Sequence, residues 1–151
     1  MWKRIIKMTK QEIYYDKEKT RPVTDLEVDE YGYAIIRDGC WYVFGVSKVK
    51  VYGEARVYAY NNATVWAYNH SFVWAFQDAR VEAFQNARVE ASGKVEVIAC
   101  GKASVWARGY TRVWAFDEAF VHEYDRSKVY VQSSSVRYIY LSPDGYRASN
   151  F

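Results

Sequence analysis

The 151-residue sequence is poor in proline, methionine, histidine and cysteine, with two of each. Cys40 and Cys100 are far apart and form no Cys-x-x-Cys pair, which excludes a thiol metal site or redox motif of that kind. We therefore expect a reduced, cytoplasmic protein without a structural disulfide. His70 and His122 occupy different positions of the repeat described below, so we do not expect them to share a metal ion.

Long apolar segments and an excess of one charge are also missing. No stretch approaches the roughly eighteen apolar residues of a membrane-spanning helix, and the N-terminus, MWKRIIKMTKQEI, lacks the apolar core and cleavage site of a secretory signal. The 21 basic and 18 acidic residues give a net charge of only +3, which excludes an acidic DNA mimic and nucleic-acid binding by charge alone. No hydrolase, zinc-protease, P-loop or dinucleotide motif occurs. We expect a protein that is not an enzyme and uses no cofactor or metal.

What the sequence does have is a repeat. Valine recurs at every eighth position from Val49 to Val129, with a small or β-branched residue two positions before it. Alanine follows two positions after each valine from Ala59 to Ala115. These residues alternate with larger ones and would share one side of a strand. Four positions after the valine come residues that tolerate left-handed backbone, namely Gly53, Asn61, Asn69, Gly93, Gly101, Gly109, Asp117 and Asp125.

A short strand and a tight corner repeated in one direction predict an all-β fold, a parallel β-solenoid of eight-residue repeats. An antiparallel meander would need alternating turn types, and the pattern lacks the period of a helix. The small Ala and Val interior favours a two-sided coil of sixteen residues over a three-sided coil of twenty-four. In the two-sided coil Glu96 lies between Arg80 and Arg112, whereas the three-sided coil would stack Arg56 on Arg80.

We expect three parts in one structural unit: an N-terminal cap at 1–46, the solenoid at 47–134, and a C-terminal cap strand and tail at 135–151. Capped ends would prevent end-to-end growth. Asp38-Gly39, between two apolar runs, predicts a hairpin in the N-terminal cap. The aromatic residue that often follows three positions after the valine predicts a stacked ladder along each edge. Glu123 stands at an inward position otherwise held by Ala or Val, where we expect the last coil to open to solvent.

Large aromatic side chains at outward positions are the candidate partner-binding residues. One face carries Arg56, Tyr58, Phe72 and Trp74 side by side, followed by Trp106, Phe120 and His122, and the opposite face carries Trp66, Trp114 and Tyr130. A large aromatic residue buries ~150–250 Å². Three bare neighbours would approach ~600 Å², near the upper limit for a monomer. We therefore expect the cap, a second copy or another partner to cover them, and such residues dominate binding hot spots.

The octad consists of Ala-x-Val-x-Ala, then Tyr or Phe, then a corner residue, as in ARVYAYNN, ATVWAYNH and ARVEAFQN. It resembles octapeptide arrays in uncharacterised proteins of gut bacteria and their phages, over residues 47–134. The resemblance implies the architecture and assigns no catalytic or binding residue. A phage origin would imply a small non-enzymatic inhibitor of a host defence complex, like anti-CRISPR proteins, acting in the cytoplasm of the infected cell.

Four functions follow from these observations. The leading one is a rigid interaction protein whose aromatic and Arg residues bind a protein partner or a second copy, forming a homodimer. Single-stranded nucleic acid is an alternative partner, because Ala55 to Gln77 contains no acidic residue and seven aromatic ones. Carbohydrate binding or hydrolysis would depend on Glu82 and Glu90 near the aromatic residues. A filament-forming role is disfavoured by the expected caps.

Overall fold

The computed structural model describes residues 11–142 and 145–149, with side chains up to residue 140. Seventeen strands form two sheets, and no helix occurs in these residues. Sheet A contains, in spatial order, β1 (Glu12–Tyr14), β4 (Cys40–Phe44), β6 (Arg56–Ala59), β8 (Phe72–Gln77), β10 (Arg88–Gly93), β12 (Ser104–Ala107), β14 (Phe120–Tyr124), β16 (Arg137–Ser142) and β17 (Gly145–Ser149). Sheet B contains β2 (Glu27–Val28), β3 (Ala34–Ile36), β5 (Lys48–Val51), β7 (Thr64–Ala67), β9 (Arg80–Ala83), β11 (Glu96–Ala99), β13 (Arg112–Ala115) and β15 (Lys128–Val131).

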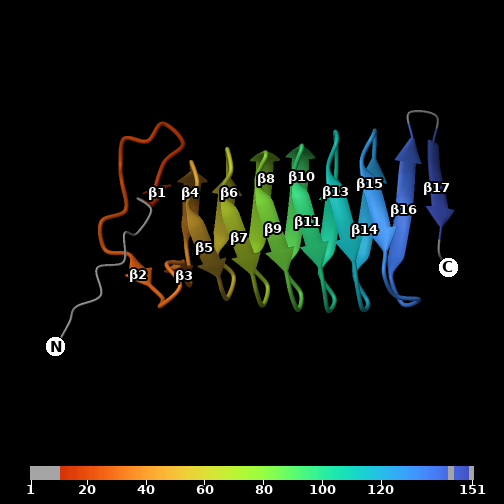
Figure 1. The fold of residues 1–151 in the computed structure, drawn as a ribbon, viewed down its shortest axis with the longest axis horizontal. Coiled ribbons are helices and arrows are strands. Elements are labelled where there is room, and N and C mark those ends of the chain that lie inside the picture. The colour runs from red at the N-terminus through yellow and green to blue at the C-terminus, as the bar shows by residue number, and fades with distance from the viewer. Residues whose placement is uncertain (1–10, 143–144, 150–151) are drawn as a thin grey trace.

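From β3 to β16 successive strands alternate between the two sheets, so the chain winds into a rod of about seven turns (Figure 1). Neighbouring strands within the octad region are parallel and pair residues sixteen positions apart, as Val73 does with Val89. The predicted two-sided parallel β-solenoid is therefore confirmed. Sequential strands never lie side by side in one sheet there, because each corner carries the chain across the rod to the other sheet.

A thin core of valine and alanine joins the two sheets. The octad valines from Val49 to Val121 are at most 1% exposed, and the alanines between them are equally buried. Side chains of this size allow the two sheets to approach closely with few voids, which a two-sided coil requires. The alternation of inward and outward residues in each octad therefore fixes both the strand and the side of the sheet that it buries.

The corners are stacked and tied by side-chain amides. All the predicted corner residues have positive φ, and so do Gln77 and Gln85, which occupy the same position of the octad. The Gly45 amide donates to Asn61 Oδ1 at 2.9 Å, and the Asn61 amide donates to Gln77 Oε1 at 2.6 Å. A long amide side chain thus compensates the strain of the left-handed backbone by a hydrogen bond to the preceding coil.

The predicted edge ladders are present. Their rings stack at centroid distances of 4.8–5.1 Å, in the series Phe44, Tyr60, Phe76 on one edge and Tyr52, Tyr68, Phe84 on the other. Further along the rod the rings give way to other groups, and the Arg108 guanidinium lies 4.2 Å from the centroid of the Tyr124 ring.

The predicted hairpin at Asp38-Gly39 is wrong. Gly39 has the expected positive φ of 80°, but the turn joins β3 in sheet B to β4 in sheet A and is a solenoid corner. Strand β3 pairs in parallel with β5 over residues fifteen positions apart, from Ala34 and Val49 onward. The parallel stack thus begins within the expected cap segment, 1–46. The first coil is one residue shorter than the others, which hides it from a search for octads.

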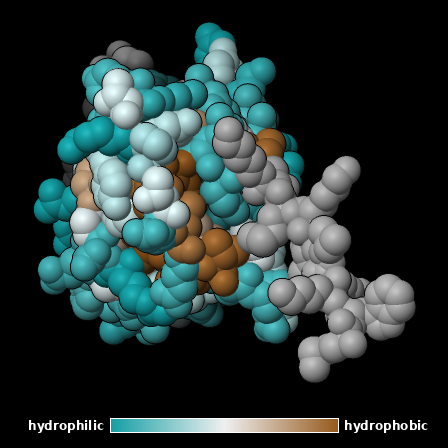
Figure 2. Space-filling model, turned by 90° about the vertical axis from the view of Figure 1, so that its left-hand side faces the viewer, coloured by the Kyte–Doolittle hydropathy of each residue, from teal (hydrophilic) through white to brown (hydrophobic). Residues whose placement is uncertain are grey.

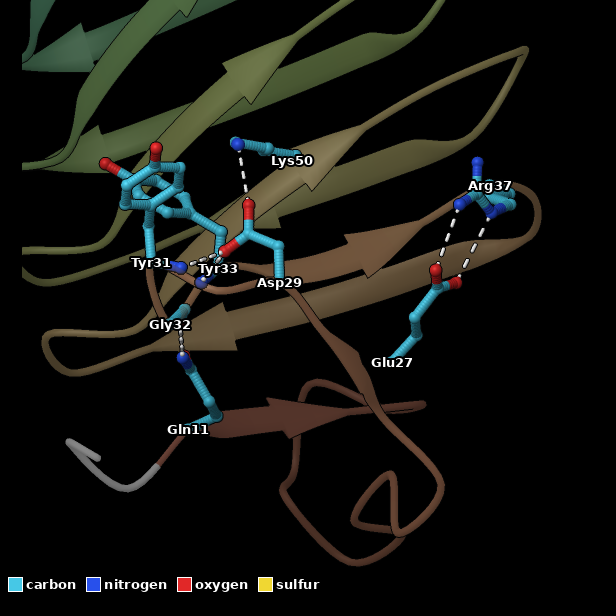
Figure 3. Close-up of polar contacts among 8 residues, drawn as sticks. All are labelled: Gln11, Glu27, Asp29, Tyr31, Gly32, Tyr33, Arg37 and Lys50. Carbon is cyan, nitrogen blue, oxygen red and sulfur yellow. Dashed lines mark hydrogen bonds and ion pairs between the residues drawn. The ribbon is translucent and has the colours of Figure 1, made fainter. Parts of the chain in front are cut away.

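The N-terminal end is closed by two antiparallel strands, β1 on β4 and β2 on β3. Gln11 bridges the two parts of this cap, because its Nε2 donates to the Gly32 carbonyl at 2.7 Å (Figure 3). Its Oε1 accepts from the Lys48 backbone amide of β5 at 3.0 Å, which ties the cap to the solenoid. Arg37 and Glu27 form an exposed ion pair at 3.1 Å. Seen from this end, hydrophobic residues gather in the middle of the surface and hydrophilic ones surround them (Figure 2).

At the other end, β16 pairs in parallel with β14 over residues seventeen positions apart, beginning with Arg137 and Phe120. The extra residue lies in the segment that contains Ser133, Ser134 and Ser135, and it places Val136 in the core. Strand β17 then closes sheet A in antiparallel orientation. Sheet B ends at β15.

Candidate functional site

Four of the predicted residues lie together on sheet A. The rings of Tyr42, Tyr58 and Trp74 form a parallel ladder with centroid distances of 4.8 and 4.5 Å and interplanar angles of 7° and 8°. Phe72 stacks on Trp74 at 4.0 Å. Trp74 therefore contacts two rings of its own chain. Arg56 pairs in register with Phe72 beside this ladder.

The other three predicted residues of sheet A form a second cluster. His122 stacks on Trp106 at 4.9 Å and 7°, and Phe120 meets His122 edge-on at 4.6 Å. Burial lowers the pKa of His122, which favours the neutral imidazole at physiological pH. Glu90 pairs in register with both Trp74 and Trp106, so it separates the two clusters by one strand.

These contacts change the expectation that the aromatic residues of sheet A need a covering partner. Trp74 contacts two rings, those of Tyr58 and Phe72, Trp106 contacts His122, and all of these residues are half-buried. A ring that already contacts two others has less free surface for a nucleic-acid base or for a partner's aromatic side chain. Sheet A is therefore a weaker candidate than the sequence indicated.

On sheet B, Trp66 is covered from one side by Lys50 of β5 and by Tyr33 of the cap. The Lys50 ammonium lies 5.2 Å from the centroid of its ring, and Tyr33 packs against it at 5.0 Å. Asp29 holds Lys50 at 2.6 Å and accepts the backbone amides of Tyr31 and Tyr33 at 2.9 Å each (Figure 3). The Lys50 hydrogen bond lowers the pKa of Asp29, and the same bond raises the pKa of Lys50. The pair therefore stays ionised and fixed in place.

Trp114 is covered from the opposite direction. Tyr130, its in-register neighbour on β15, stacks on it at 5.3 Å and 19°. The Arg112 guanidinium lies 5.8 Å from its ring centroid. The other in-register neighbour of Trp114 is Ile98, which offers no ring.

A groove of about 620 Å³ lies between these two indoles. Its lining combines apolar and charged groups, namely Tyr33, Lys48, Thr64, Trp66, Arg80, Val81, Glu82, Glu96, Ile98, Trp114 and Phe116. Trp66, Glu82, Ile98 and Trp114 occupy successive rungs of one row. Three strand spacings separate the indoles, or about 14 Å. Within the described residues, no ring covers the side of Trp66 that faces Glu82 or the side of Trp114 that faces Ile98. The Arg112 guanidinium, held by Glu96 on the strand of Ile98, is the cation near Trp114.

The charges around the groove are only partly paired. Glu96 bridges Arg80, at 3.8 Å, and Arg112. Glu82 has no hydrogen bond or ion pair within the described part of the chain, although its neighbours in the row are Trp66 and Ile98. Lys48 contributes a further cation to the lining. The groove therefore offers one unpaired carboxylate between two indoles whose facing sides carry no ring of the described chain.

Other sequence-derived possibilities do not assemble a site. Glu82 and Glu90 lie on opposite sheets, so they cannot act as the carboxylate pair that glycoside hydrolysis requires. Both cysteines are free thiols, and burial raises the pKa of Cys100. The described residues contain no group of three His, Cys, Asp or Glu that could hold a metal ion. No helix in this part of the chain is long and apolar enough to cross a membrane.

Sequence reasoning missed Tyr33, Tyr42 and Lys50. Tyr33 and Tyr42 precede the octad region, and only the first coil's register of fifteen positions brings Tyr33 beside the row of Trp66. One sequence signal could have placed Tyr33 next to a strand of the stack, namely the alternation of inward and outward residues over Ala34 to Ile36.

Comparisons of the chain with protein-family models, with curated proteins and with solved structures found no match.

Proposed function

We propose that this protein is a non-catalytic interaction protein whose binding site is the groove between Trp66 and Trp114. The observation that carries the proposal is a pair of indoles with no ring of the described residues on the sides that face each other across Glu82 and Ile98. On sheet A only one rung, that of Glu90, separates Trp74 from Trp106, so no gap of two rungs lies between them.

In the row from Trp66 to Trp114 the two middle positions carry no aromatic ring, so two side chains of a partner would complete an aromatic stack. Flat or apolar groups fit best, since they stack on the indoles and pack on Ile98. A guanidinium in the rung next to Trp66 would also pair with Glu82. Covered tryptophans commonly contribute about 2 kcal/mol or more each to binding. A protein partner, or a second copy in a homodimer, supplies such side chains.

The identity of the partner has less support than the position of the binding site. The resemblance to phage-associated octapeptide arrays supports a component of a host defence complex, and no residue of the groove selects that partner over another.

The test compares substitutions in the groove with a matched substitution outside it. Trp66→Ser and Trp114→Ser should abolish capture of a specific protein from bacterial lysate, or reduce the molar mass in light scattering if the partner is a second copy. Trp74→Ser removes the same side chain from sheet A, where its ring contacts Tyr58 and Phe72 and lies outside the groove, and should leave binding unchanged. Equal loss in all three variants would indicate a general folding defect. Undiminished binding in Trp66→Ser and Trp114→Ser would contradict the proposal.

Single-stranded nucleic acid is the second candidate, because a basic row runs beside the groove. It comprises Lys48, Arg80, Arg112 and Lys128, at corresponding positions of sheet B. Glu96 neutralises part of this row and Glu82 would repel a phosphate, so we rank this function second. Binding of an oligothymidylate that weakens steeply with salt would favour it. Retention that is weak and insensitive to salt would remove it.

A further inference from the structure

At three of the four sheet edges of the rod, an antiparallel strand covers the end of the parallel stack. At the N-terminal end β1 covers β4 and β2 covers β3, and at the C-terminal end β17 covers β16. The fourth edge is β15 in sheet B, and no strand of the described chain pairs with its outer side. An open edge is a template for an added strand, and folds that avoid such addition close or charge it.

Half of the backbone hydrogen-bonding groups of β15 point toward β13, and the other half have no neighbouring strand in the described part of the chain. The Lys128 and Gln132 amides donate to the carbonyls of Thr111 and Ala115 on the β13 side. Backbone groups of successive residues point to opposite sides of a parallel strand. The N–H and C=O groups of Val129 and Val131 therefore point away from β13, toward the open edge.

The core is open at the same place. Val129 is only half-buried and Val131 is 37% exposed, whereas the valines from Val49 to Val121 are at most 1% exposed. Tyr130, on the outward side of the strand, is 40% exposed. Both the hydrogen-bonding groups and the apolar side chains of β15 thus lack a neighbour on one side.

The rows that end at β15 define what the next strand should carry. Arg112 and Lys128 are in-register neighbours of like charge, so an acidic residue in the next rung would relieve their repulsion. Trp114 and Tyr130 form a stacked pair that another ring would extend. Val129 ends a row of inward valines, which an apolar residue would continue.

We propose that β15 accepts an extended segment of a partner protein as an additional antiparallel strand. The segment places an acidic residue opposite Lys128, an apolar residue opposite Val129 and an aromatic residue opposite Tyr130. From its N-terminus to its C-terminus, the partner segment therefore carries an aromatic, an apolar and an acidic residue at consecutive positions. Main-chain hydrogen bonds supply affinity in this mode of recognition and the side-chain rows supply selectivity. The edge lies outside the groove proposed above and its use does not depend on that groove.

The test uses a short synthetic peptide with valine-tyrosine-valine-glutamate at its centre, titrated into the full-length protein. We expect saturable binding, and at least about tenfold weaker binding, or 1.4 kcal/mol, when the glutamate is replaced by lysine. In hydrogen exchange, the Val129 and Val131 amides should exchange fast in the free protein and slowly with peptide. Slow exchange of these amides in the free protein would overturn the proposal, because the edge would already be covered.

Val131→Pro is the decisive variant. It removes an amide that points to the open edge and leaves the β13–β15 hydrogen bonds intact, so the fold should tolerate it. Circular dichroism and thermal unfolding verify this. We expect peptide binding to be lost in Val131→Pro and retained in Trp66→Ser, which separates the edge from the groove. Unchanged binding in a folded Val131→Pro variant would refute strand addition at β15. Lys128→Glu, which should weaken binding of the glutamate peptide and improve that of the lysine peptide, tests the charge rule if Val131→Pro does not fold.

Discussion

Ser71 and Thr111 are buried side chains whose hydroxyl groups have no hydrogen-bond partner among the described residues. They occupy an inward octad position that Ala fills elsewhere, as at Ala63 and Ala79. Burying a hydroxyl without a partner costs about 1–3 kcal/mol. We expect Ser71→Ala and Thr111→Val to raise the free energy of unfolding by up to about 1 kcal/mol, measured by urea denaturation.

Ser47 is the matched control for this prediction. It stands at the same octad position, but its Oγ accepts the Glu12 amide at 2.6 Å and so ties β1 to the first coil. Ser47→Ala should lower the free energy of unfolding by about 1–3 kcal/mol, because it leaves a backbone amide unpaired. Equal effects at Ser47 and Ser71 would show that the hydroxyl of Ser71 has a partner in solution.

Glu123 stands at an inward position, paired in register with Ala107, and burial raises its pKa above the ordinary value of 4.5. The folded state therefore binds this proton more tightly than the unfolded state. The resulting penalty on stability is absent below the unfolded pKa and complete above the raised folded pKa. Glu123→Ala should stabilise the protein at neutral pH, with an advantage that shrinks as the pH falls through this window.

Urea denaturation at several pH values measures this effect. Glu90→Ala, at an outward exposed position, is the control and should show no comparable gain. A Glu123→Ala variant whose advantage over the wild type is the same at neutral and acidic pH would contradict the assignment.

At the scale of the elements, the corners determine how closely the coils approach. Gly93 has a φ of 104°, and a Cβ there would lie 3.0 Å from the backbone nitrogen of Gln77 in the preceding coil. Gly32, in the cap, has a φ of 85° but no atom within 4 Å of such a Cβ. We expect Gly32→Ala to cost about 1–2 kcal/mol of backbone strain. Gly93→Ala should cost more, because the coils must also separate.

Thermal and chemical unfolding of the two glycine variants check this comparison. A smaller loss of stability in Gly93→Ala than in Gly32→Ala would mean that the corner relaxes without moving the neighbouring coil.

The sequence predicted the elements of the octad region well, because each octad specifies its own strand, corner and buried side. Val73 over Val89 follows from the spacing alone. The first and last coils escaped the pattern, since one is a residue short and the other a residue long, as the Ala34–Val49 and Phe120–Arg137 pairs show.

The candidate site was predicted less well. Octad position indicated that Trp66, Trp74 and Trp114 point outward, but it could not show which ring faces are covered. That depends on residues sixteen positions away and on side-chain torsions, as when Phe72 turns onto Trp74. Tyr33 lies outside the octads altogether, yet it closes one side of Trp66. The groove therefore emerges only from the three-dimensional arrangement.

At the scale of the whole molecule, any one coil of sixteen residues in the octad region is a unit that can be deleted. Deleting residues 79–94 should preserve the fold, both caps and the sheet on which each later strand lies. It should bring β7 and β13 closer by one strand spacing, about 4.8 Å. Spin labels at Thr64→Cys and Arg112→Cys, in a background without Cys40 and Cys100, measure this change.

Deleting only residues 79–86 is the control. It would move every later strand to the opposite sheet and separate Trp114 from Trp66, whereas the Glu96–Arg112 ion pair would move with both of its residues. An unchanged label distance after the longer deletion would contradict the two-sided register.

Because each residue of the octad region pairs with the one sixteen positions later, distances along a row are multiples of one strand spacing. Two side chains in the same row can be one, two or three steps apart, and no intermediate distance exists. A partner that binds the rod at two points must therefore match a whole number of strand spacings. Point substitutions change the affinity at each point, whereas the distance between the two points changes only when the gene gains or loses an entire turn. Strength and span can therefore evolve independently.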